Sequence, residues 1–429
     1  ISDSHSDNAY AGTTGAEVVP FENNSIEGSN SVLERDWNRY LEDVARANKL
    51  ICNIDLVTDN SLTTAERAQY KAEAKIFRAM VMFDMVRLWG DFPVITTVAD
   101  DITSENIDEV YPQYFPKQNT ELEAYQQIEK DLLDAVLYAP DNTPGNKTLF
   151  TKSVARTLLA KIYAEKPLRD YTKVIQYCDE VKEDGFDLVD DFSDLFGMNA
   201  AGTDAKMRNT KESILEAQFT SGAGNWCSWL FGRELGYWNN KLTWAKWVTP
   251  SRDLISAFKQ EGDEVRFKES IVYYDCNWSN YYPSDNYPFM YKCRSANSSI
   301  IKYRYADVLL LKAEALIMQD TPDLEGAADI IDEVRDRAKL GALPTSVRSN
   351  KNVLLNALLK ERRLELAFEG QRWFDLVRLD KVEEVMNAVY AKDSGRKAQI
   401  YTFDKNSYRL PIPQSVIDAN DKIHQNPGY

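Results

Sequence analysis

Apolar side chains recur at helical spacing along most of the chain. Between residues 37 and 48 they follow an i, i+3, i+4, i+7 pattern, which predicts an amphipathic helix. The segment 64–89 predicts a longer helix, with Thr64 as its N-cap. The sequence GDFP at 90–93 ends that helix, because glycine is favoured just past a helix and proline cannot continue one. Residues 121–138 predict another helix after an irregular stretch.

Further helices are predicted in pairs. The pattern over 152–184 predicts a helix hairpin whose length is close to a tetratricopeptide period of ~34 residues. Similar patterns over 303–340 and 353–389 predict two more pairs. The sequence therefore predicts an all-α fold on a scaffold of tetratricopeptide-like helix pairs, although periodicity alone leaves an unrelated all-α bundle open.

Helical periodicity fails between residues 186 and 301. This stretch is rich in Gly, Asn, Tyr and Trp, and a loop-like segment of such length in a compact protein is usually functional. We expect a single unit over 1–429, in which 1–185 begins irregularly and holds the first helix pairs. Residues 186–301 would be a long, loop-rich insertion with little regular structure that forms the ligand face. Residues 302–429 would hold the C-terminal helix pairs and tail.

Charge and histidine content exclude several functions. The chain has 51 Lys and Arg against 67 Asp and Glu, a formal net charge of −16, which would repel nucleic acid over most of the surface. Its two histidines, His5 and His424, lie near the chain ends, so we expect no catalysis or zinc binding that needs imidazole in a preorganised cleft. Glycine-rich phosphate-binding motifs are absent. We expect no nucleic acid partner, no histidine-dependent catalysis, no metal and no cofactor.

The cysteines and the chain start carry less information. Five scattered cysteines without a CxxC motif argue against a zinc site and a dense disulfide framework. One bridge within the set Cys227, Cys276 and Cys293 stays open. No apolar run reaches the ~18 residues that a membrane helix needs. The first residue is Ile rather than Met, so we expect that an N-terminal segment was removed by processing or by choice of the expressed chain.

Aromatic residues cluster in the predicted insertion. Residues 226–291 hold 13 of the 32 Trp and Tyr of the chain, several of them beside asparagines. Flat rings with adjacent amides suit sugars, which present apolar faces flanked by hydroxyls. An alternative is that these rings pack a loop-rich subdomain or a protein interface. The predicted glycan-binding residues are Trp226, Trp229, Trp238, Trp244, Trp278, Tyr281 and Tyr282.

Two charged segments have both a structural and a chemical interpretation. The segment 361–378 (ERRLELAFEGQRWFDLVR) alternates charges with bulky apolar residues, which predicts ion pairs that lock helices together. Its carboxylates Glu365 and Glu369 could instead serve glycoside hydrolysis. The acidic run over 184–194 could ligate calcium, but it lacks the spacing of a calcium loop, and a solvated acidic turn is favoured.

Eight segments, taken together and in order, carry a resemblance. They are AEAKIFRAMVMFDMVRLWGDFPVIT (72–96), AYQQIEKDLLDAVLYAP (124–140), FTKSVARTLLAKIYA (150–164), GFDLVDDFSDLF (185–196), KESILEAQF (211–219), YRYADVLLLKAEAL (303–316), ERRLELAFEGQRWFDLVRL (361–379) and LPIPQSVIDANDKIHQNPGY (410–429). The last two are highly specific, and the eight span nearly the whole chain. The chain thus resembles the SusD/RagB family, the surface glycan-binding lipoproteins of Gram-negative glycan-uptake systems.

The resemblance implies properties that composition and spacing do not show. It implies four tetratricopeptide-like helix pairs with a loop-rich, non-catalytic glycan-binding face. It also implies an outer-membrane lipoprotein, exposed at the cell surface, that delivers oligo- or polysaccharide to a TonB-dependent outer-membrane transporter. Cys52 lies too deep to be the lipid anchor, so the membrane-attached cysteine would precede Ile1. The ligand residues vary within the family, so none is carried over.

Two alternatives remain open at this stage. One is an all-α glycoside hydrolase that uses acidic residues, which the scarcity of histidine does not exclude. The other is a family member that caps the transporter and binds a non-glycan nutrient such as a peptide.

Overall fold

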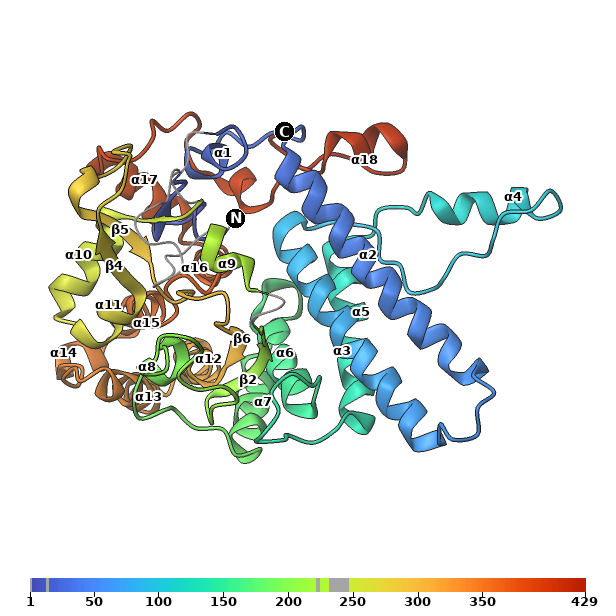
Figure 1. The fold of residues 1–429 in the computed structure, drawn as a ribbon, viewed down its shortest axis with the longest axis horizontal. Coiled ribbons are helices and arrows are strands. Elements are labelled where there is room, and N and C mark those ends of the chain that lie inside the picture. The colour runs from blue at the N-terminus through green and yellow to red at the C-terminus, as the bar shows by residue number, and fades with distance from the viewer. Residues whose placement is uncertain (1, 13–14, 221–223, 231–246) are drawn as a thin grey trace. The chain divides into compact units, whose positions relative to one another are not determined.

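The fold is described from a computed structural model (Figure 1) that places residues 2–12, 15–220, 224–230 and 247–429. Helices account for 53% of the chain and the strands are few and short, which confirms the all-α prediction. None of the helices in the placed ranges is both long and apolar enough to cross a bilayer.

The residues group into two compact units. Unit 1 comprises Ile1–Ser25, Thr143–Thr148 and Tyr171–Asp404, and unit 2 comprises Ile26–Asn142, Leu149–Asp170 and Lys405–Tyr429.

Unit 2 is a set of packed helices. Helix α3 (Thr64–Trp89) packs against α2 (Ser31–Asn53) and α5 (Glu121–Tyr138), and α5 packs against α6 (Lys152–Ala164). The bounds of α3 and α5 are those predicted from the sequence, because apolar periodicity and local caps define both helices. The other elements of this unit are η1 (Ile54–Leu56), α4 (Ile107–Val110), η2 (Tyr111–Tyr114), η3 (Lys166–Leu168), η5 (Lys405–Tyr408) and α18 (Gln414–Ala419).

The N-cap of α3 differs from the prediction by one residue. Thr63, not Thr64, is the cap: its side chain accepts from the amide of Glu66, and the Glu66 side chain accepts from the amide of Thr63. Two consecutive threonines precede the helix, and the capping box selects the one that has Glu66 three residues later.

Unit 1 contains the C-terminal helix pairs. Helix α12 (Tyr305–Met318) packs against α7 (Tyr171–Glu183), α13 (Leu324–Arg337) and α15 (Lys351–Glu365). The two helices of the hairpin predicted over 152–184 are present, but α6 belongs to unit 2 and α7 to unit 1. Other helices of unit 1 are α1 (Val19–Glu22), α8 (Ser193–Phe196), α9 (Trp226–Leu230), α14 (Thr345–Arg348), α16 (Arg372–Arg378), α17 (Val382–Lys392) and the short η4 (Ser284–Asn286).

Residues 186–301 hold more regular structure than the sequence predicted. Helix α10 (Arg252–Glu261) is capped by Ser251 and ended by Gly262 in the left-handed conformation (φ +70°), and α11 (Glu264–Ser270) follows directly. Apolar residues of α10 form one buried cluster with residues of α15, which explains how a short helix is stable within a loop-rich region.

The described residues of unit 1 also form three small antiparallel sheets. Strand β1 (Ala9–Tyr10) pairs with β3 (Thr249–Pro250), β2 (Ser213–Ala217) with β6 (Ile300–Arg304), and β4 (Ile271–Tyr274) with β5 (Tyr287–Met290). The β1–β3 pairing places Ala9 opposite Pro250 and Tyr10 opposite Thr249.

The beginning of the chain is irregular, as predicted, but it is buried rather than peripheral. Ser4, Ser6 and Asn8 are each at most 1% exposed. The Nδ1 atom of His5 lies 2.6 Å from the carbonyl oxygen of Phe21. A polar segment can be buried in this way only where its polar groups find hydrogen-bond partners.

Candidate functional site

The seven predicted ligand residues fall into different environments. Trp226 begins α9 and is 69% exposed, more than any other large hydrophobic residue that the structure describes within 186–301. Trp229 lies in the same helix, but its side chain is outside the described atoms. Trp238 and Trp244 lie outside the described residues.

Trp278, Tyr281 and Tyr282 lie on the connection between β4 and β5. The Trp278 indole is half-buried and meets Tyr287 edge-on, with ring centroids 5.7 Å apart. Tyr282 is half-buried, and its hydroxyl donates to the carbonyl oxygen of Pro250 at 2.8 Å. The hairpin therefore gathers aromatic side chains through edge-to-face contacts, which favour a defined arrangement of rings.

Tyr281 is packed within the protein. Its ring is 5% exposed and stacks on Tyr10 at a centroid distance of 4.6 Å and an interplanar angle of 5°. Its hydroxyl donates to Glu22 Oε2 at 2.6 Å. Burial and the adjacent Glu22 carboxylate raise the pKa of the Tyr281 phenol, so it stays protonated and keeps donating. In this conformation Tyr281 therefore packs against other parts of the protein, which is the alternative to glycan binding that the sequence left open.

Arg252 joins these rings to the N-terminal segment. Its guanidinium carbon lies 4.3 Å from the Tyr282 ring centroid, and Arg252 Nη1 donates to the Tyr10 hydroxyl at 3.1 Å. The Tyr10 hydroxyl donates in turn to Asp393 Oδ2 at 2.7 Å. Burial, together with the bond to Asp393, raises the pKa of Tyr10 to about 12.

Sequence reasoning missed Tyr10 and Arg252 as parts of this cluster. Tyr10 lies about 270 residues from Tyr281 along the chain, and no local pattern marks it as the partner that stacks there. The strand at Ala9–Tyr10 has only two residues, too few to show the alternation that would predict its pairing with β3.

The arrangement suits weak, reversible contact with a neutral ring-shaped ligand. Trp226 is 69% exposed, and Trp278 and Tyr282 each retain some exposed area. Exposed Asn277 supplies a planar amide beside Trp278. Such groups give contact area through the rings and orientation through the amide. Assignment of Trp226, Trp278 and Tyr282 to a ligand remains a prediction.

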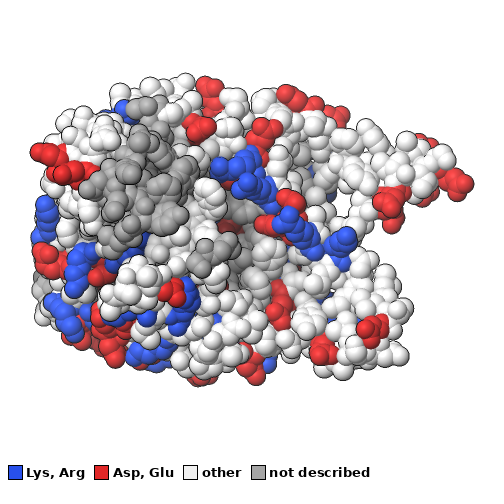
Figure 2. Space-filling view, viewed as in Figure 1, with Lys and Arg blue, Asp and Glu red and all other residues white. Residues whose placement is uncertain are grey.

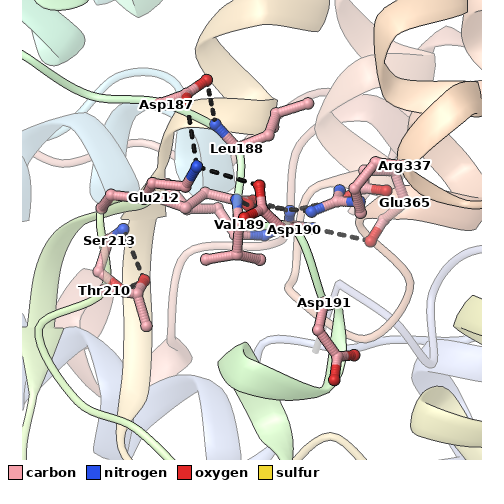
Figure 3. A network of polar contacts seen from close by, with 12 residues as sticks. Asp187, Leu188, Val189, Asp190, Asp191, Thr210, Glu212, Ser213, Arg337 and Glu365 are labelled. Carbon is pink, nitrogen blue, oxygen red and sulfur yellow. Dashed lines mark hydrogen bonds and ion pairs between the residues drawn. The ribbon is translucent and has the colours of Figure 1, made fainter.

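A buried ion-pair network joins the aromatic region, residues 226–291, to other elements of unit 1 through Arg266 of α11. Its centre is Glu365, at the end of α15, which Arg304 contacts at 2.5 Å and Arg266 at 3.0 Å. Arg337 donates to Glu365 as well, and it also donates to Glu212 Oε2 at 2.9 Å. Figure 3 shows Glu212, Arg337 and Glu365 directed toward one another. The network thus connects α11, α13, α15 and the β2–β6 sheet.

The electrostatics of Glu365 do not fit a glycosidase acid. Burial by itself would raise the pKa of this carboxyl, but Arg337, Arg304 and Arg266 together hold it well below its usual range. A catalytic acid must carry a proton near neutral pH and must reach the substrate. Glu365 is ionised and its side chain has no exposed surface.

Glu369, the other carboxylate of the hydrolase alternative, also belongs to the network. It accepts from Lys292 Nζ at 2.6 Å and from Arg304 Nε at 2.7 Å. Because Lys292 is buried, its pKa falls to about 8, and the nearby Glu369 carboxylate limits that fall. Both carboxylates are therefore engaged in buried ion pairs, and the geometry does not support hydrolysis by this pair.

The rest of the 361–378 segment also makes buried ion pairs, as its sequence predicted. Arg362 reaches Asp375 through Nε at 2.9 Å and Asp307 through Nη2 at 2.8 Å. Arg378 reaches Asp375, three residues earlier in the same helix, at 2.7 Å. The chain breaks helical geometry between α15 and α16, where Phe368 has φ +63°, so the segment is two helices rather than one.

The acidic run over 184–194 is paired with lysines. Lys206 Nζ lies 2.8 Å from Asp191 and 2.7 Å from Asp194, and Lys211 Nζ lies 3.1 Å from Asp187. Within the placed ranges, no group of three or more His, Cys, Asp or Glu side chains is arranged to hold a metal ion. These pairs support the favoured interpretation of a solvated acidic turn.

Charge on the visible surface is mixed. Figure 2 shows Lys and Arg interspersed with Asp and Glu over the face that it presents. The formal charge of −16 is therefore not spread as a continuous acidic surface on this face.

Comparisons with known proteins agree in sequence and in fold. A family model described as "SusD family" matches residues 285–429, and one described as "Starch-binding associating with outer membrane" matches residues 2–164. A SusD-like protein of Formosa agariphila is 27% identical over 456 residues, which cover 95% of this chain and 83% of that protein.

Two solved structures are similar over nearly the full length. One is a laminarin binding SusD-like protein, with a TM-score of 0.75 and 24% identity, covering 100% of this chain and 93% of that one. The other is the surface glycan-binding protein A of Bacteroides thetaiotaomicron in complex with laminarihexaose, with a TM-score of 0.77 and 20% identity, covering 99% and 92%.

Proposed function

Because this chain belongs to the SusD family, we propose that it is a non-catalytic receptor that binds oligo- or polysaccharide at the cell surface. The bound glycan then passes unchanged to a partner TonB-dependent transporter of the outer membrane. The protein itself is a lipoprotein of the outer membrane, exposed at the cell surface.

The observation that carries the proposal is the family assignment, which rests on matches at both ends of the chain and on a relative aligned over 95% of it. The description of the model that matches residues 2–164 names starch binding and the outer membrane. Two proteins of the same fold bind laminarin or laminarihexaose according to their descriptions. These facts support glycan as the ligand class.

The geometry of the described residues supports ligand binding without catalysis. Exposed Trp226 and half-buried Trp278 and Tyr282 offer ring surface for stacking on a pyranose. The carboxylates that could have served hydrolysis, Glu365 and Glu369, are engaged in ion pairs within the network. Stacking and hydroxyl contacts on an open face allow fast release, which delivery to a transporter requires.

The direct test is a binding screen of the purified chain. Isothermal titration calorimetry against a panel of neutral polysaccharides, with laminarin and starch as first probes, should show binding of at least one glycan. Chromatography of that glycan after prolonged incubation should show no shorter product. Binding of none of the panel, or release of shorter oligosaccharides, would contradict the proposal.

Delivery is tested separately. The lipidated protein and its partner TonB-dependent transporter should copurify from outer-membrane extracts, and import of labelled glycan by whole cells should require both. If cells that lack the protein import the glycan at the normal rate at limiting concentration, the delivery step is wrong even where binding is confirmed.

A further inference from the structure

Two cysteines of unit 1, Cys227 and Cys293, lie against the same side chain, Asn225. All five cysteines are thiols in the structure, and the side chains of this pair are close enough to influence each other. Cys227 is half-buried on α9, and Cys293 is 8% exposed in the segment after β5. The two residues are distant in sequence, so the fold alone brings them together.

Asn225 fixes the geometry around the two sulfur atoms. Its Nδ2 donates to Cys293 Sγ at 3.3 Å, and its Oδ1 accepts from the backbone amide of Cys227 at 2.9 Å. The Asn225 side chain also donates to the carbonyl oxygen of Ser298 at 2.8 Å. The backbone amide of Asn225 donates to the carbonyl oxygen of Ala296 at 2.6 Å. The start of α9 is thus held against the chain that contains Cys293.

Cys293 is itself held from both sides. Lys292 pairs with Glu369 in the buried network at 2.6 Å, and Arg294 pairs with Glu269 at 2.8 Å. Cys293 therefore occupies a fixed position, while Cys227 retains access to solvent on the helix above it. A fixed buried thiol beside a partly exposed one is the arrangement in which an external oxidant can react first with the exposed sulfur.

We propose that Cys227 and Cys293 form a disulfide bond in the oxidised protein, which links α9 and its exposed Trp226 covalently to the anchored segment 291–299. The neighbouring Cys293 side chain lowers the pKa of the Cys227 thiol, which increases its thiolate fraction. Of the bridges that the sequence left open, this assignment excludes Cys276, whose sulfur donates to the carbonyl oxygen of Trp278 at 3.2 Å.

The reaction is a thiol–disulfide exchange. The Cys227 thiolate attacks the disulfide of an oxidant, either an envelope thiol–disulfide oxidoreductase or oxidised glutathione, and one thiol leaves. The Cys293 thiolate then displaces the second thiol from the mixed disulfide. Two protons and two electrons pass from the cysteines to the oxidant, and one sulfur–sulfur bond forms. The proposed disulfide does not depend on glycan binding. It rests on the proposed outer-membrane location only because that compartment supplies the oxidant.

Peptide mapping of the full chain tests the proposal. The folded protein is equilibrated in glutathione buffers from reducing to oxidising, quenched in acid, denatured, alkylated and digested. In the oxidising buffer, mass spectrometry should find a peptide linking Cys227 to Cys293 and full alkylation of Cys52, Cys178 and Cys276. In the reducing buffer, all five cysteines should be alkylated.

Variants identify the bridge independently of that map. Cys227→Ser should take up one more alkyl group than the wild type under oxidising conditions, and Cys276→Ser should keep the bridge. Amide hydrogen exchange over 225–230 should be slower in oxidised than in reduced wild type. Alkylation of Cys293 at every potential, or a bridge that contains Cys276, would overturn the proposal, and the wild-type map decides even if a variant fails to fold.

Discussion

At the scale of single residues, Trp226 is the strongest ligand candidate because its ring is 69% exposed on a helix of the aromatic region. Replacing it with Ala should weaken binding of the glycan identified in the screen by about 0.5–1.5 kcal/mol, the range that one aromatic contact contributes. Titration calorimetry measures the change. The matched control is Tyr401→Ala, since Tyr401 is 63% exposed in the same unit and outside the predicted set.

A different result would relocate the site. If Trp226→Ala leaves affinity unchanged, the next candidates are Tyr111 and Tyr114 in the 94–119 loop, which are 52% and 50% exposed. These two belong to unit 2, and Figure 1 shows that loop, with α4, extending away from α3 and α5.

Arg372 tests the structural role of the 361–378 segment. It is 8% exposed and contacts both carboxylate oxygens of Asp7 at 2.8 and 2.9 Å. Arg372→Ala should lower stability by about 3–5 kcal/mol, because it leaves a buried carboxylate without one of its cations. Chemical denaturation followed by circular dichroism measures the loss.

The control for that variant is an exposed pair in the same unit. Lys211→Ala breaks the contact with Asp190, whose side chain is 96% exposed, and should cost less than about 1 kcal/mol. Unchanged stability of Arg372→Ala combined with lost glycan binding would show that this arginine serves the ligand instead.

Asp7 adds a pH-dependent contribution to stability. Burial raises the pKa of this carboxyl, but Arg363 and Arg372 lower it more, so its folded pKa is well below the unfolded value. A carboxyl whose pKa is lower in the folded than in the unfolded protein stabilises the fold above its unfolded pKa of about 3.9. That stabilisation is lost as the pH falls toward the folded pKa. The stability difference between wild type and Asp7→Asn should therefore be full above about pH 5 and shrink below about pH 4. A difference that stays constant from neutral pH to about pH 3 would contradict the ionised state of Asp7.

At the scale of elements, the cap of α3 gives a test within two adjacent residues. Thr63 completes the capping box with Glu66, whereas Thr64 is the first helical residue. Thr63→Ala should lower stability by about 0.5–2 kcal/mol, and Thr64→Ala should change it far less. Denaturation midpoints of the two variants measure this, and equal effects would contradict the assigned cap.

The junction between α15 and α16 shows why an element needs its tertiary partners. Phe368 and Gly370 both adopt positive φ, +63° and +73°, in the turn that brings Glu369 beside Lys292 and Arg304. A phenylalanine in this conformation is strained, and the ion pairs around it maintain the conformation.

At the scale of the whole molecule, the affinity for a neutral glycan should depend little on the salt concentration. The formal charge is −16, yet stacking and hydroxyl contacts involve no ion pair with the ligand. Raising the salt from about 0.1 M to about 1 M, which shortens the Debye length from about 10 Å to about 3 Å, should leave affinity nearly constant. A chelator should have no effect, because the described residues hold no cluster suited to a metal. Loss of binding with either treatment would indicate an ionic or metal-mediated contact.

Much of this protein follows from its sequence because the signals are local. The bounds of α3 and α5 follow from apolar periodicity and from residues within a few positions of each end. The clustering of Trp and Tyr over 226–291 marks the predicted face, and eight ordered segments indicate the family. The helix α10 was missed because its apolar face spans only ten residues within a region that lacks periodicity elsewhere.

Only the tertiary structure decided which of these residues are buried and with which partners. Asp7 and Arg372 lie 365 positions apart and form a buried pair, and Glu365 binds arginines from three separate elements. Tyr281, predicted as a ligand platform, is 5% exposed and stacks on Tyr10. Periodicity reports which face of a helix or strand is apolar, but it carries no information on which distant charge or ring completes a buried contact, because that depends on how the whole chain packs.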